Sequence, residues 1–207
     1  MNCQNQKMKR SQWLINFAAA VLCILLCIIM GISVMHKANY RRYVDNISSM
    51  EQLLADECQA ELVDIVLVCD YATNRFPSVK KLQVVGFQVK ENVREIRLAV
   101  FAEKEKGTQL LKIIPQSHLY EISKQISLTD TTINIDGIVE TLQIIVSTDP
   151  LLDSVMYRSF LPEEPDTVSW NVIGDIQSPL ILVLEGDNDG YITEYKFMDS
   201  AGNEITG

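Results

Sequence analysis

The longest apolar run of the chain lies near its start, over residues 13–35. It contains no charged side chain, and its most polar members are Asn16 and Ser33. As a helix, this run would be roughly 35 Å long, enough to cross a hydrocarbon core of about 30 Å. A helix that is apolar on all sides is unusual in a soluble chain of 207 residues. We therefore expect a transmembrane helix at 13–35, preceded by a short basic tail at 1–12.

The apolar run is too long for a cleaved signal peptide, whose apolar core spans about 7–15 residues. The sequence after Met35 also lacks the small-x-small pattern that a signal peptidase needs. We therefore expect a retained, single-pass signal anchor in the cell membrane. Basic residues flank both ends equally, so charge counting does not settle the orientation. The acid-free tail favours a cytoplasmic N-terminus and an extracytoplasmic C-terminal domain.

The segment after the anchor, residues 36–75, has the apolar spacing of a helix. The residues that recur every three or four positions are Tyr40, Tyr43, Val44, Ile47, Met50, Leu54 and Cys58. We expect a juxtamembrane connecting helix that continues the anchor. Over 40–54 the same stripe fits heptad positions, so this helix either lies on the domain or forms a parallel homodimer. Residues 62–69 would also suit a buried strand, but no glycine or proline separates them from the helix, which favours helix.

The remainder, residues 76–207, alternates apolar and polar positions as strands do. The predicted strands are 82–90, 95–102, 109–114, 131–135, 138–147, 167–173, 180–185 and 191–198. Residues 115–126 place apolar side chains on one helical face, and Asp149-Pro150 is typical of a helix start, so we expect two short covering helices at 115–126 and 150–160. The fold class is α+β, a mostly antiparallel, β-rich domain.

Charge is concentrated at the C-terminal end of the chain. Residues 149–207 contain 12 acidic residues and only two basic ones, Arg158 and Lys196. Such a surface repels phosphate backbones, which argues against a nucleic-acid partner. It suits solubility, and it would attract a cation or a basic protein.

Catalytic motifs are missing from the sequence. The two histidines are His36 and His118, and neither accompanies a nucleophile elbow, a zinc pattern or a phosphate-binding loop. We therefore expect no enzyme and assign no catalytic or cofactor-binding residue.

One stretch has ligand-like spacing, Glu185 to Ile192, in which oxygen-bearing residues fall at alternate positions. It partly resembles a calcium loop whose ligands would be Glu185, Asp187, Asp189 and Glu194. Lys196 stands where such a loop needs its final glutamate, and a strand precedes it. A turn of residues 187–190, joining the last two strands as a hairpin, is the favoured interpretation, with calcium as the secondary hypothesis.

Two further expectations concern the cysteines and the function. Cys58 and Cys69 could form a disulfide in an oxidising compartment, or stay apart if one helix carries both. The layout suggests a membrane-anchored protein that presents its domain for protein–protein interaction, such as an accessory subunit of an envelope or secretion assembly. The alternative is a membrane-tethered sensor, or a module that binds an ion or another ligand.

Overall fold

The computed structural model describes residues 21–28, 30, 43–90, 92–163, 168–186 and 191–206. The chain divides into two units, Met1–Arg42 and Tyr43–Gly207. In the first unit, residues 21–28 are helical, whereas the tail and most of the expected anchor (13–20, 29 and 31–35) lie outside the described residues. Among the described residues, no helix is both long enough and apolar enough to span a membrane.

The second unit is built mainly from antiparallel strands, which confirms the predicted β-rich architecture. Its elements are β1 (Tyr43–Val44), α2 (Ile47–Cys58), β2 (Val63–Tyr71), β3 (Lys81–Val89), β4 (Asn92–Lys104), β5 (Gly107–Ile114), the 3-10 turn η1 (Gln116–His118), β6 (Tyr120–Ser123), β7 (Ile126–Ile135), β8 (Ile138–Ser147), β9 (Leu152–Phe160), β10 (Asn171–Ile173), β11 (Leu180–Glu185) and β12 (Ile192–Asp199). Three sheets result: sheet A has the order β1-β5-β4-β3-β2, sheet B β11-β8-β7-β6, and sheet C β10-β9-β12.

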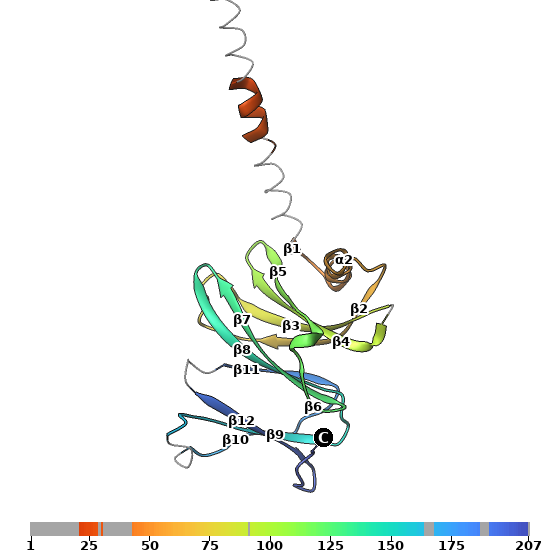
Figure 1. Ribbon diagram of the computed structural model, residues 1–207, viewed down its shortest axis with the longest axis vertical. Coiled ribbons are helices and arrows are strands. Elements are labelled where there is room, and N and C mark those ends of the chain that lie inside the picture. The colour runs from red at the N-terminus through yellow and green to blue at the C-terminus, as the bar shows by residue number, and fades with distance from the viewer. Residues whose placement is uncertain are drawn as a thin grey trace, which may run out of the picture. The chain divides into compact units, whose positions relative to one another are not determined.

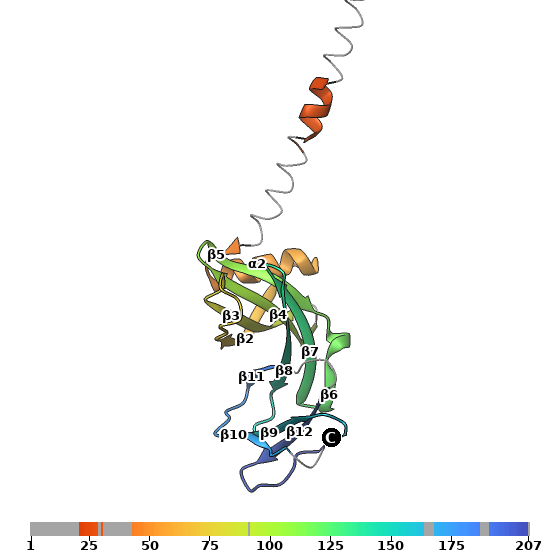
Figure 2. The ribbon, with the colours of Figure 1, turned by 90° about the vertical axis from the view of Figure 1, so that its left-hand side faces the viewer.

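These elements stack in four layers, in the order α2, sheet A, sheet B and sheet C (Figures 1 and 2). Each interface between layers has its own apolar core. Leu54 of α2 packs against Phe87 and Phe101 on one face of sheet A. The opposite face of sheet A meets sheet B. The other face of sheet B meets sheet C, around Ile145 and Val155. Sheet B is therefore covered on both faces.

The predicted helix through residues 36–75 is corrected, because the helical part begins at Ile47 and ends at Cys58. The side chain of Asn46 accepts a hydrogen bond from Ser49 N, which caps the start, and Gln59 adopts a left-handed conformation (φ 54°) that stops the helix. Residues 63–71 form β2 instead of more helix. Residues 36–42 lie outside the described residues.

The apolar stripe of α2 packs onto the domain of its own chain. This is the first of the two arrangements that the sequence allowed for this helix. Met50 and Leu54 are buried against sheet A. The homodimer through residues 40–54 stays a prediction, and it would have to use the side of α2 that carries the exposed Ile47.

Neither of the two predicted covering helices forms. In the first segment only η1 is helical, and β6 follows it as the edge strand of sheet B. In the second, the Asp149 carboxylate accepts a hydrogen bond from Leu151 N at 3.0 Å, so Asp149 and Pro150 make a turn. The chain then enters β9, which buries Leu152, Val155 and Phe160 and pairs with β10 and β12.

The predicted hairpin at residues 187–190 is also corrected. β11 pairs with β8 in sheet B, whereas β12 pairs with β9 in sheet C. The connection therefore passes from one sheet to another, and residues 187–190 themselves lie outside the described residues. The turn at Asp136-Gly137, in contrast, joins β7 and β8 as a hairpin, and both residues have positive φ.

Candidate functional site

The four candidate calcium ligands do not form one described cluster. Glu185 ends β11 in sheet B and pairs with Arg75, at 3.2 Å from Nε to Oε1. Glu194 lies in β12 of sheet C and pairs with Arg158, at 2.7 Å from Nη2 to Oε2. Asp187 and Asp189 lie outside the described residues. Within the part of the chain that the structure describes, no group of three or more His, Cys, Asp or Glu side chains is placed to hold a metal ion.

A buried carboxylate lies beside one of these candidates. Glu140 of β8 is 5% exposed, and neither carboxylate oxygen has a hydrogen-bond donor among the described residues. Its nearest cation is Arg75, whose Nε is 3.9 Å from Oε1. Arg75 is already bound to Glu185 through two parallel hydrogen bonds of 3.2 Å. Two carboxylates therefore share one guanidinium.

Burial dominates the electrostatics of this cluster. It raises the pKa of Glu140, and the Glu185 charge raises it further, while Arg75 acts in the opposite direction. Burial, followed by Glu185 and then Glu140, also raises the pKa of Tyr71 to about 12. The Tyr71 hydroxyl therefore stays protonated at every physiological pH, whereas burial favours the protonated form of Glu140.

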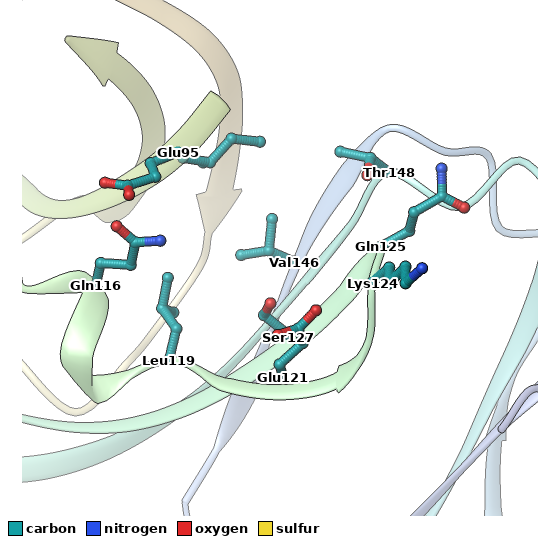
Figure 3. Close-up of a pocket in the computed structure, with 10 residues that line it drawn as sticks. Glu95, Gln116, Leu119, Glu121, Lys124, Gln125, Ser127, Val146 and Thr148 are labelled. Carbon is teal, nitrogen blue, oxygen red and sulfur yellow. The ribbon is translucent and has the colours of Figure 1, made fainter. Parts of the chain in front are cut away.

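A polar groove lies between sheets A and B and encloses about 320 Å³. Its lining residues are Glu95, Ile96, Gln116, Leu119, Glu121, Lys124, Gln125, Ser127, Val146 and Thr148. Figure 3 shows Glu95 and Gln116 at one end of the groove, and Lys124, Gln125 and Thr148 at the other.

The chemistry of this groove is that of a site for a small polar molecule. With its amide nitrogen turned toward Glu95, Gln116 donates to Oε1 at 3.2 Å. Glu121 adds a second carboxylate and Lys124 a single ammonium group, and Val146 provides a buried apolar floor. Carboxylates and an ammonium group in one cavity suit a ligand that carries both charges.

The outer face of sheet C carries a ladder of aromatic and cationic side chains. The guanidinium carbon of Arg158 lies 4.8 Å from the ring centre of Trp170 and 5.1 Å from that of Phe160. Lys196 Nζ lies 5.1 Å from the ring centre of Trp170. Arg158 and Lys196, the two basic residues of the acidic C-terminal third (residues 149–207), therefore both lie over the indole ring of Trp170. At these distances cation–π attraction is significant.

The sequence reasoning missed this ladder and Glu140. In the sequence, Arg158 and Lys196 stand out as the two bases of an acidic region, and Lys196 also as the residue in place of the final glutamate of a calcium loop, but no spacing rule connects residues 158, 170 and 196. For Glu140 a signal did exist, because it continues the inward row of Leu142, Ile144 and Val146 at every second position of β8.

Comparison with known proteins identifies no relative. No family model, no curated protein and no solved structure matches the chain.

Proposed function

We propose that this chain is a single-pass, membrane-anchored protein that holds its β-rich domain outside the cytoplasm and works by binding another protein through the outer face of sheet C. The anchor is supported by the uncharged run of residues 13–35 in the sequence. The binding role is supported by the composition and exposure of that face.

The uncovered outer face of sheet C is the observation that carries the proposal. Sheet C is the last of the four layers, and no helix or sheet within the described residues packs on its outer side (Figure 2). On this face Val172 is 61% exposed and Ile192 is 48% exposed, beside the partly exposed Trp170 and Arg158, whereas Phe160 at the end of the ladder is only 5% exposed. Aromatic residues and arginine beside apolar side chains are typical of the energetic centre of a protein interface.

The charge around this face indicates the kind of partner. Arg158 is paired with Glu194, and Lys196 lies 4.0 Å from Glu204, so both bases already have acidic neighbours. The remaining acids of the C-terminal third carry the net negative charge. We infer a partner with an apolar centre and a basic rim, because opposite charges speed encounter and exclude acidic competitors.

Site-specific crosslinking in intact cells tests this proposal. A photo-crosslinking amino acid in place of Val172 should give one discrete adduct, whereas the same amino acid at the exposed Tyr120 of sheet B serves as the matched control. Trp170→Ala should weaken binding of the isolated partner by about 2 kcal/mol or more, roughly 30-fold in Kd. Raising the salt concentration from about 0.05 to 0.5 M should also weaken the binding between the unmodified protein and its partner.

Two results would reject the binding role of sheet C. Equal adducts from positions 172 and 120 would show that sheet C has no special role. An adduct that persists unchanged in the Trp170→Ala protein would show that the ladder is structural. Extraction of the chain by alkaline carbonate would separately reject the membrane anchor.

The groove between sheets A and B supports a second candidate, a sensor that binds a small zwitterion such as an amino acid. Lys124 would meet the carboxylate of that ligand, and Glu95 or Glu121 its ammonium group. Titration calorimetry with a panel of amino acids tests this candidate. Heat that is lost in the Glu95→Gln protein supports it, and no heat at millimolar ligand concentrations rejects it.

A further inference from the structure

The cluster around Glu140 lies where the edges of two sheets meet. β2 is an edge strand of sheet A and β11 an edge strand of sheet B. Tyr71 ends β2, and Arg75 follows in the connection to β3, where its amide donates to the Thr73 hydroxyl at 3.2 Å. Glu185 ends β11. The Arg75–Glu185 pair therefore joins these two edges, and Glu140 lies next to it.

Glu140 makes this junction sensitive to its own charge. Arg75 and Glu185 are the charged groups that face it, and Tyr71 is the other titratable group. Its neighbour across the β7–β8 ladder is the apolar Ile133. Nearby in β7, the hydroxyl of Thr131 is also buried without a hydrogen-bond partner among the described residues. An ionised carboxylate in such surroundings is costly, because no donor replaces the water it has lost.

We propose that Glu140 is a proton-operated latch that controls how tightly the edges β2 and β11 close on each other. When Glu140 is protonated, the site contains no buried charge, and Arg75 pairs with Glu185 alone. With Glu140 ionised, two carboxylates compete for one guanidinium, and the edges separate enough to admit water. This inference does not depend on the partner proposed for sheet C, which lies on another layer.

The direction of the pH dependence follows from the raised pKa of Glu140. The folded protein binds this proton more tightly than the unfolded chain does, whose glutamate has the ordinary value of 4.5. The stabilisation from the proton is complete below that value. It is lost as the pH rises through the higher pKa of the folded state.

Hydrogen–deuterium exchange of the full chain in detergent micelles tests the latch. Between about pH 5 and pH 8, and after correction for intrinsic exchange, peptides from β2 and β11 should exchange at least threefold faster at the higher pH. In the Glu140→Gln protein, exchange should stay slow at both values because a neutral amide replaces the carboxylate. Glu105→Gln, which neutralises an exposed carboxylate in the turn between β4 and β5, is the matched control and should behave as the unmodified protein.

Each alternative result decides against the latch. Slow exchange at both pH values in the unmodified protein overturns it, and so does the same pH dependence in the Glu140→Gln protein. If that variant fails to fold, the carbon-13 shift of the Glu140 carboxyl in the unmodified protein decides instead. A titration midpoint above 4.5 is expected, and a midpoint at or below 4.5 overturns the proposal.

Discussion

At the scale of single residues, Gly186 shows how closely the two partners β8 and β11 approach at their ends. Its amide donates to Thr141 O at 2.7 Å. A Cβ at this position would lie 2.7 Å from Thr141 Cγ2 and 2.8 Å from Thr141 O, whereas a Cβ on Gly174 would meet nothing within 4 Å. The absence of a side chain is therefore required at Gly186 but not at Gly174.

We predict that Gly186→Ala lowers the free energy of unfolding by about 1–3 kcal/mol, because the backbone of β8 or β11 must shift to relieve the overlap. Gly174→Ala should change it by less than about 0.5 kcal/mol. Urea denaturation of both proteins, followed by circular dichroism, measures the difference. Equal stability of the two variants would contradict this prediction.

Candidate site residues were predictable only where a local pattern marked them. Glu185 was found through its spacing to other oxygen-bearing residues, and it does take part in an electrostatic cluster. Its actual neighbours are Arg75 and Glu140, which lie 110 and 45 positions away in the sequence. Such neighbours come from the stacking of sheets A and B, and no local pattern reports which strands will stack.

At the scale of elements, the strands were easier to predict than the helices. Apolar side chains dominate residues 82–90, 138–147 and 180–185, and each segment corresponds to an observed strand. The helix expected at 150–160 was wrong because Asp149 and Pro150 suit a turn as well as a helix start. Residues 152–160 form a strand because β10 and β12 pair with β9, one on each side.

Residues 62–69 were misassigned for a different reason. They lie in an edge strand that has a register shift between Ile65 and Leu67. Ile65 therefore faces the α2 side of sheet A, whereas Leu67 faces sheet B. The helix assignment of this stretch came from the lack of a glycine or proline between it and the preceding helix, but Gln59, in a left-handed conformation, ends α2 without either.

Sheet A separates the two cysteines of the domain. Cys58 packs with the core under α2 and Cys69 with the core between sheets A and B, and both are free. We predict that both stay thiols even in an oxidising compartment. Alkylation of the unfolded chain without reductant should modify both. In the folded chain Cys69 should react slowly, since burial raises its pKa. A disulfide-linked peptide in a proteolytic digest would contradict this.

Polar side chains fix sheet C on sheet B. The Tyr195 hydroxyl donates to the side-chain oxygen of Gln143, and Gln143 Nε2 donates to the Thr193 hydroxyl at 3.2 Å. Gln143 is buried, so its oxygen would lose this donor in the Tyr195→Phe protein. We predict a loss of about 1–3 kcal/mol and faster amide exchange in β9 and β12. Tyr191→Phe, at an exposed position, is the control and should have no effect.

At the scale of the whole domain, sheet B is the layer on which the others depend. Its strand β8 contributes Leu142 and Ile144 to the core with sheet A, and Ile145 to the core with sheet C. Loss of sheet B would therefore expose both of these cores together. This arrangement favours one cooperative unfolding transition for the residues from Tyr43 onward.

We predict that a fluorescence probe in sheet C and the circular dichroism of all strands report the same urea midpoint. Trp170 is the natural probe, and Trp13→Phe removes the second tryptophan of the chain. Coincident curves are expected. A fluorescence transition at clearly lower urea would show instead that sheet C unfolds by itself.

The contact between α2 and β2 has a consequence for how copies of the domain behave at high concentration. β2 is a long edge strand with Val66 and Val68 43% and 51% exposed, the kind of edge on which fibrils start. Glu51 Oε1 accepts the amide of Ile65 at 3.1 Å and so occupies one of the groups that an incoming strand would need. Glu51→Ala should therefore aggregate sooner than the neighbouring, exposed control Gln52→Ala, as light scattering over days of storage would reveal. One carboxylate on a surface helix thus helps to keep the domain soluble.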